Sequence, residues 1–304
     1  MSQTGNKTVI IIAGPTAVGK TTVAIRLAKH FKTEIISADS RQCYKELIIG
    51  VAKPSEEELE EVPHHFIASH SVQEEVTAVT FEQFALQKVN ELFRENDIVI
   101  VVGGTGLYIK AFCEGLDLVP EIDPAIRQHI IKSYEEKGMS WLQQQLAEKD
   151  ALFSETGEMQ NPQRMMRALE VVESTGQSVL SFRKGEKAKR NFKIIKIGLE
   201  LPKEELHRNI HTRVDRMVEA GLLEEVKRLT PFRNLNALQT VGYAEVFEQL
   251  DGTISPEKAI EKVKTHTRQY AKRQMTWFRK DKDFIWFHPS QIEKIKGTIT
   301  DALD

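Results

Sequence analysis

The sequence has only two cysteines in 304 residues, Cys43 and Cys113, and neither belongs to a motif with the spacing of metal ligands. A disulfide framework is therefore not expected, and a reducing cytoplasm is the simplest setting. Long apolar runs are also missing: the longest are far shorter than a membrane span needs. Residues 1–7 are polar and lack the apolar region of a signal peptide, so we expect a cytoplasmic protein without a membrane partner.

An excess of charge of one sign is likewise absent, because 42 Lys and Arg residues against 44 Asp and Glu residues leave a net charge of −2. Any contact with nucleic acid must therefore come from local basic patches. What is present is ordinary for a globular protein, with 40% hydrophobic and 28% charged residues. A chain of this length can bury a large core and can contain two domains.

The most informative stretch follows an apolar, β-branched run at residues 9–13, which predicts a buried strand. Residues 14–21 then read G-x-x-x-x-G-K-T, and apolar residues at helical spacing follow, so strand, glycine loop and helix come in the order of a P-loop. Gly14 and Gly19 let the backbone N–H groups turn inward toward phosphates. Lys20 supplies a cation and Thr21 a hydroxyl for magnesium. The motif leaves open which phosphate compound binds.

Two further predicted strands, at residues 35–36 and 98–102, end in polar or glycine-rich segments. Asp39 follows the first and could be a base, a magnesium ligand or a helix N-cap. The second leads into Gly-Gly-Thr-Gly at 103–106, where Thr105 offers a hydroxyl. This strand does not end in Asp or Glu, which argues against an ATP-hydrolysing motor and leaves Asp39 as the best-placed carboxylate.

Residues 118–190 form a mostly helical block between strands of the α/β core. Asp123-Pro124 predicts the start of a helix that carries Arg127, and Asn161-Pro162 the start of another that carries Arg164 and Arg167. The sequence thus predicts an α/β fold: a P-loop NTPase-like parallel sheet core, residues 1–117 and 191–304, with an inserted all-helical domain at 118–190.

Basic residues gather in two places, residues 183–196 and a helix predicted at 264–282, where phosphate-backbone binding and a solvated surface compete as explanations. We also expect a long helix at 204–229 that presents Arg213, and a last strand at 284–287. The pair His64-His65 lies in a loop-like region without completing a ligand set, so we expect no metal there.

Three classes of protein agree with these residues: a P-loop kinase of a small metabolite, an enzyme that holds a diphosphate and transfers the attached group to RNA, and a nucleotide-controlled RNA-binding protein. The missing carboxylate at the end of the strand at 98–102 argues against the nucleotide-controlled RNA-binding protein. The two basic segments argue against the kinase, because a small metabolite needs no extended phosphate-binding surface.

Many motifs in order resemble one family, the bacterial tRNA dimethylallyltransferases (tRNA isopentenyltransferases). They are GPTAVGKT at 14–21, SADSRQ at 37–42, GVAKP at 50–54, PHH at 63–65, VGGTGLY at 102–108, NPQRMMRALE at 161–170, VGY at 241–243 and RQYAKRQMTWFR at 268–279. The resemblance covers nearly the whole chain. Family members often have Asp-Ile-Gly-Thr-Ala-Lys-Pro where this chain has Ile-Ile-Gly-Val-Ala-Lys-Pro at 48–54.

The resemblance implies transfer of a dimethylallyl group from its diphosphate to the exocyclic amine of the adenine 3′ of the anticodon. Asp39 would be the base and Thr105 would position the reacting groups. The implied diphosphate site consists of Gly14, Pro15, Thr16, Ala17, Val18, Gly19, Lys20, Thr21 and Arg213, with Mg²⁺ at Thr21. The implied contacts to the anticodon stem-loop are Asp39, Ser40, Arg41, Gln42, Thr105, Arg127, Gln163, Arg164, Met165, Met166 and Arg167. We expect a monomer. The rival within this chemistry is an adenylate isopentenyltransferase that acts on free nucleotides.

Overall fold

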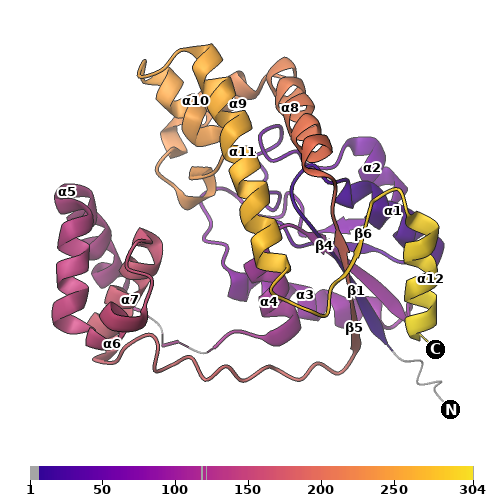
Figure 1. Cartoon of the computed structure of the whole chain (residues 1–304), viewed down its shortest axis with the longest axis horizontal. Helices are drawn as coiled ribbons and strands as arrows, with labels where there is room; N and C mark the ends of the chain where they lie inside the picture. The colour runs from indigo at the N-terminus through magenta and orange to yellow at the C-terminus, as the bar shows by residue number, and fades with distance from the viewer. Residues whose placement is uncertain (1–6, 118, 121, 304) are drawn as a thin grey trace. The chain divides into compact units, whose positions relative to one another are not determined.

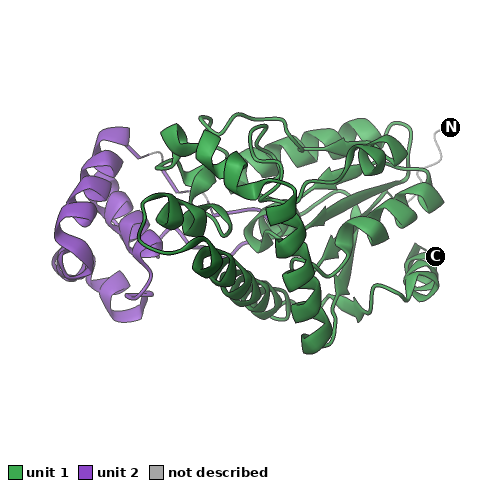
Figure 2. Ribbon diagram, turned by 90° about the horizontal axis from the view of Figure 1, so that it is seen from above, with its two compact units in different colours: residues 1–114, 189–304 green, residues 115–188 purple. Residues whose placement is uncertain are grey.

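The computed structural model describes residues 7–117, 119–120 and 122–303. The chain divides into two compact units, one of residues 1–114 and 189–304 and the other of residues 115–188, shown in green and purple in Figure 2. The sequence places the insert at 118–190, and Leu118, where that prediction begins, lies outside the described residues. None of the described helices is long and apolar enough to cross a membrane.

The larger unit is built on a six-stranded sheet with the order β3-β2-β4-β1-β5-β6, in which all neighbouring strands are parallel. The strands are β1 Thr8–Ala13, β2 Ile35–Ser37, β3 His64–His65, β4 Ile98–Gly103, β5 Lys193–Leu199 and β6 Ile285–Phe287. All six residues of β1 are buried between β4 and β5, which explains its continuous apolar run. The predicted parallel α/β core is confirmed.

Helices pack against the sheet (Figure 1). Helices α1, Lys20–Phe31, and α12, Ile292–Leu303, share one core with the sheet, in which Leu27 and Ile295 pack with Ile10. Helices α3, Ala78–Leu92, and α4, Gly106–Glu114, pack together through the stacked rings of Phe81 and Tyr108, 4.7 Å apart. The remaining helices of this unit are α2 Glu56–Glu61, α8 Lys203–Glu219, α9 Leu222–Arg228, α10 Tyr243–Leu250 and α11 Pro256–Phe278, with 3-10 turns at Thr230–Phe232 and Asn236–Leu238.

Three sequence predictions of secondary structure are wrong. The helix predicted at 204–229 is interrupted because Gly221 adopts φ 98°, a left-handed conformation that ends α8 and starts α9. The basic helix begins eight residues earlier than predicted, at Pro256, where Ser255 accepts a hydrogen bond from the backbone N–H of Lys258. His64 and His65 form the edge strand β3 rather than a loop.

The smaller unit consists of helices α5 Pro124–Lys149, α6 Ala151–Thr156 and α7 Pro162–Thr175. The predicted caps are confirmed: Asp123 accepts from the backbone N–H of Ala125, and Asn161 from that of Arg164. A core of its own holds the unit together, since Leu142, Leu169 and Ile130 are fully buried within it. Gly138, at φ 74°, bends α5 in its middle.

Candidate active site

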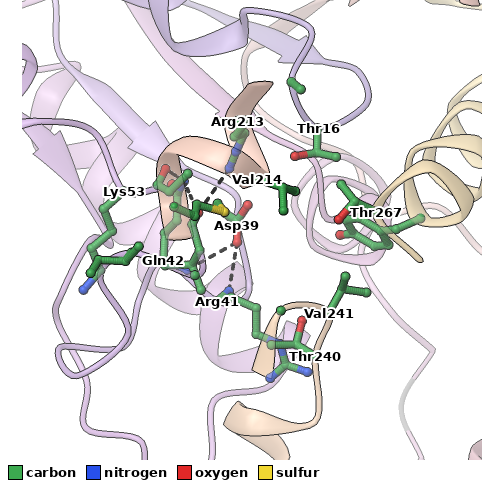
Figure 3. A pocket seen from close by; sticks show the side chains of 18 of the residues that line it. Thr16, Asp39, Arg41, Gln42, Lys53, Arg213, Val214, Thr240, Val241 and Thr267 are labelled. Atoms are coloured by element: carbon green, nitrogen blue, oxygen red, sulfur yellow. Dashed lines mark hydrogen bonds between the residues drawn. The ribbon is translucent and has the colours of Figure 1, made fainter. Parts of the chain in front are cut away.

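Because the strands are parallel, the carboxyl ends of β1, β2 and β4 meet at one edge of the sheet, and a cavity of about 1200 Å³ lies there. The glycine loop after β1, residues 37–54, α8 and α11 supply most of its lining. Figure 3 shows Asp39, Gln42 and Arg213 close together in this cavity. Ten of the residues predicted for the site line it: Thr16, Ala17, Gly19, Lys20, Thr21, Asp39, Ser40, Arg41, Gln42 and Arg213.

The glycine loop has the conformation that its two glycines permit. A side chain at Gly14 would bring a Cβ within 2.6 Å of the carbonyl oxygen of Leu199, and Gly19 adopts φ 95° immediately before α1. Lys20 Nζ donates to the carbonyl oxygen of Pro15 at 2.7 Å, so the lysine folds back over its own loop. Val18 is buried in the core. Gly14, Pro15 and Val18 therefore shape the loop rather than line the cavity.

Two cations and one carboxylate lie within electrostatic reach of one another in the cavity. Burial lowers the pKa of Lys20 to about 7; the charge of Asp39 opposes this shift and that of Arg213 adds to it. Burial also lowers the pKa of Arg213, again opposed by Asp39. Two desolvated cations beside a single carboxylate suit a ligand with several negative charges, such as a diphosphate.

The carboxylate of Asp39 is fixed by its own loop. Its Oδ1 accepts hydrogen bonds from the backbone N–H groups of Arg41, at 2.9 Å, and Gln42, at 3.3 Å. Both bonds end on the same oxygen, so Oδ2 remains available to a proton donor in the cavity. Residues 40–43, directly after Asp39, form a turn, and no helix begins there. The interpretation of Asp39 as a helix N-cap is therefore wrong.

Thr105 lies beside this turn, because β2 and β4 are neighbours in the sheet. Its Oγ1 accepts from the backbone N–H of Ser40 at 3.0 Å and donates to Ser40 Oγ at 3.3 Å, while its own N–H donates to the carbonyl oxygen of Ala38 at 3.2 Å. The threonine hydroxyl thus contacts Ser40, the residue after Asp39, while Thr105 itself is not among the residues that line the cavity.

Gln274 is a site residue that the sequence did not reveal. Its side chain is 6% exposed; Oε1 accepts from the backbone N–H of Thr16 at 2.8 Å, and Nε2 donates to the carbonyl oxygen of Gly104 at 2.9 Å. One amide thus joins the glycine loop to the turn that carries Thr105. The signal lay in helical spacing: Val263, Thr267, Tyr270 and Gln274 share the cavity face of α11.

The predicted basic segments are partly structural. Lys196, 8% exposed, forms ion pairs with Asp281 at 2.7 Å and Asp283 at 3.2 Å. Arg190 pairs with Glu82 at 2.6 Å. On α11, Arg279 pairs with Glu200 at 2.9 Å. These cations balance charges within the larger unit, which weakens the explanation of both segments as phosphate-binding surfaces.

The other predicted RNA contacts lie in the smaller unit, on α5 and α7. Gln163, Arg164 and Arg167 are exposed, and Arg127 and Arg167 lie 3.9 and 3.3 Å from the two oxygens of the buried Glu170. Met165 and Met166 do not have the predicted placement. Their side chains are 0% and 7% exposed and pack in the core of the unit, because this face of α7 is its apolar stripe. The prediction that both methionines contact RNA is therefore wrong.

A magnesium ion fits the residues at the glycine loop. Thr21 lines the cavity directly after Lys20. Among the described residues no group of three or more His, Cys, Asp or Glu side chains could hold a metal ion. Mg²⁺ commonly keeps several waters and is bound through substrate phosphates with few protein ligands. A single threonine hydroxyl in a diphosphate cradle agrees with that mode of binding.

The chain is similar to known proteins over nearly its whole length. The model of the family described as IPP transferase matches residues 42–281. The tRNA dimethylallyltransferase of Cytophaga hutchinsonii is 48% identical over 290 residues, covering 95% of each chain, and that of Christiangramia forsetii is 47% identical over 285 residues, covering 94% of each.

Two solved structures are also similar. The tRNA isopentenylpyrophosphate transferase of Bacillus halodurans is 33% identical and superposes with a TM-score of 0.73 over 98% of this chain and 97% of that one. A eukaryotic dimethylallyltransferase, described as acting on tRNA, is 30% identical with a TM-score of 0.72 over 90% of this chain and 70% of that one.

Proposed function

The chain belongs to the IPP transferase family, and from this premise we propose that it transfers a dimethylallyl group from dimethylallyl diphosphate to tRNA. The acceptor is the exocyclic amine of the adenine 3′ of the anticodon, and the second product is diphosphate. The observation that carries the proposal is the single cavity in which Lys20 and Arg213 lie near the carboxylate of Asp39. A cation pair suits the leaving diphosphate, and a carboxylate suits the amine proton.

In the proposed reaction the adenine nitrogen attacks the first carbon of the dimethylallyl group. A carbon–nitrogen bond forms, the carbon–oxygen bond breaks, and the diphosphate leaves with the electron pair. The amine proton passes to Asp39 Oδ2, since Oδ1 is occupied by the backbone N–H groups of Arg41 and Gln42. Thr105, held against Ser40, orients the amine. The target base must leave its stack to reach this cavity.

The diphosphate is bound in this proposal by the glycine loop with Thr16, Lys20 and Arg213. Magnesium, when bound at Thr21, supplies further positive charge against the leaving group. The polar residues proposed to contact the anticodon stem-loop are Ser40, Arg41 and Gln42, half-buried in the larger unit, and Arg127, Gln163, Arg164 and Arg167, exposed in the smaller one. Four of these, Arg127, Gln163, Arg164 and Arg167, lie in the 115–188 unit, and a free nucleotide would need none of the four.

Incubation with labelled dimethylallyl diphosphate and either unmodified tRNA or AMP tests the proposal. We expect label in tRNA and none in AMP. Label that appears only in AMP would establish the adenylate-modifying alternative instead. The variant Asp39→Asn keeps the shape of the side chain while it removes the negative charge and the capacity to take the proton, and it is the matched variant for the role of the base.

A further inference from the structure

One wall of the cavity is a segment to which the proposed mechanism assigns no role. Residues 48–54 line the cavity without forming a helix or a strand. Ala52 adopts φ 44°, which is costly for a residue other than glycine, so this backbone must be held in place by its surroundings. Ile48 is 56% exposed, which shows that apolar burial does not hold that end of the segment.

The segment is held by a buried carboxylate on α9. Glu225 is 2% exposed, and its Oε2 accepts from the backbone N–H groups of Ile48, at 3.1 Å, and Ile49, at 2.8 Å. Its Oε1 accepts from the N–H of Gly50 at 3.0 Å and from the hydroxyl of Tyr243 at 2.6 Å. Four donors thus converge on one charged group, an arrangement in which each hydrogen bond is strengthened by the charge.

Gly50 is required by the same arrangement. A Cβ at this position would lie 2.5 Å from the ring of Tyr243, so the backbone can approach the tyrosine only because glycine has no side chain. Tyr243 is itself fully buried, and burial together with the charge of Glu225 raises its pKa, so the hydroxyl stays a proton donor. The carboxylate, the phenol and the glycine therefore form one rigid unit.

The next two residues of the segment connect this unit to the site. The carbonyl oxygen of Val51 accepts from Arg213 Nη2 at 3.5 Å and from Gln42 Nε2 at 3.3 Å, and that of Ala52 accepts from Gln42 Nε2 at 2.9 Å. Gln42 in turn donates its backbone N–H to Asp39. Glu225 does not line the cavity itself, but it fixes the backbone against which Arg213 and Gln42 are oriented.

We propose that Glu225 is a positioning residue for the donor diphosphate: through residues 48–52 it holds Arg213 in the orientation that binds the leaving group. This inference rests on the proposed function, which places a diphosphate beside Arg213. Glutamine at position 225 has the same shape but only one carbonyl oxygen for four donors, and its NH₂ group would face the donors on one side. The backbone of residues 48–52 is then no longer held in place, and Arg213 loses the fixed carbonyl oxygen of Val51 as its acceptor.

An effect of charge alone predicts tighter diphosphate binding when Glu225 is replaced by glutamine, whereas a positioning role predicts weaker binding. Burial lowers the pKa of Lys53, another residue of the cavity wall, and the negative charge of Glu225 opposes this shift, so Glu225 acts electrostatically on a cation of this site. Removing that charge would by Coulomb's law strengthen the binding of an anion. If Glu225 positions Arg213, the same substitution instead weakens the binding of the anion.

The experiment is titration calorimetry of the full-length protein with inorganic diphosphate, together with thermal unfolding and the tRNA transfer assay. We expect Glu225→Gln to weaken diphosphate binding about tenfold and Tyr243→Phe, which keeps the charge and removes one of four donors, about threefold. Glu224→Gln, at the neighbouring exposed position, should stay within about twofold of the wild type.

Unchanged or tighter diphosphate binding by folded Glu225→Gln overturns the inference, even if its unfolding temperature falls, because that combination describes a purely structural role. If Glu225→Gln does not fold, unchanged binding by Tyr243→Phe overturns it instead. Wild-type protein that binds diphosphate but transfers no label to tRNA would refute the proposed function without touching the role of Glu225.

Discussion

Lys20 makes the binding of the donor depend on pH, and the lowered pKa of this lysine means that binding weakens as the pH rises. Burial lowers the pKa of this ammonium group in the ligand-free protein to about 7; the charge of Asp39 opposes the shift and the guanidinium of Arg213 adds to it. A bound diphosphate favours the charged lysine, so binding must raise this pKa and take up a proton when it occurs above pH 7.

The magnitude follows from the titration of a single group. With a pKa of about 7, roughly one tenth of the ligand-free protein carries the charge at pH 8 and about one hundredth at pH 9. The terminal phosphate of the donor loses its last proton near pH 6, as phosphate esters do, and is constant over this range. The apparent Kd for dimethylallyl diphosphate should therefore rise about fiftyfold between pH 7 and pH 9.

Calorimetric titration without tRNA measures both quantities, because no transfer can occur. At pH 8 we expect uptake of about 0.9 proton for each donor bound, seen as a dependence of the binding enthalpy on the ionisation enthalpy of the buffer. Lys20→Met should abolish the proton uptake as well as weaken binding. Lys29→Met, on the exposed side of the same helix, should change neither.

A Kd that stays constant from pH 7 to pH 9, with no proton uptake in the wild type, would refute this reasoning. It would mean that Lys20 is already charged in the empty site. Proton uptake that persists in Lys20→Met would instead assign the titration to another group.

Three further outcomes are expected. Asp39→Asn should lower kcat by about 10²–10⁴-fold while tRNA binding in a filter assay stays within about twofold; equal loss of both would make Asp39 structural. Gln274→Leu should lower the free energy of unfolding in urea by about 1–3 kcal/mol, because the N–H of Thr16 and the carbonyl of Gly104 lose their buried partner, whereas Gln73→Leu at an exposed position should cost less than about 0.5 kcal/mol. Gly221→Ala should destabilise by about 1 kcal/mol because φ is 98° there, while Gly297→Ala, inside α12 with open space around it, should stabilise by a similar amount; the same sign for both would contradict the helix break.

The sequence by itself determined the sheet edge and the loops that surround the cavity. An apolar run, a glycine loop and a helix follow one another at residues 9–28, and strands of parallel sheets bring their carboxyl ends to one edge. Local order along the chain was therefore enough to place Lys20, Asp39 and Thr105 at the same edge. The helix caps at Asp123 and Asn161 were predictable for the same reason, since a cap depends on its immediate neighbours.

Tertiary structure alone decided which helix faces point inward. Met165 and Met166 were expected at an RNA surface and lie in a core, because their burial depends on how α7 packs against α5. The sequence of α11 drew the prediction to its basic residues, whereas Gln274 on its cavity face joins the glycine loop at Thr16 to the turn at Gly104, which lie 258 and 170 residues from it in the sequence.

Glu225 is the clearest case. In the sequence it is one acidic residue beside another, Glu224, at the start of a short helix, and nothing local distinguishes the two. Only the fold brings the backbone of residues 48–50 and the hydroxyl of Tyr243 to its carboxylate. A buried charge needs partners, and because three of the four partners of Glu225 lie 175 to 177 residues away, only the folded chain reveals them.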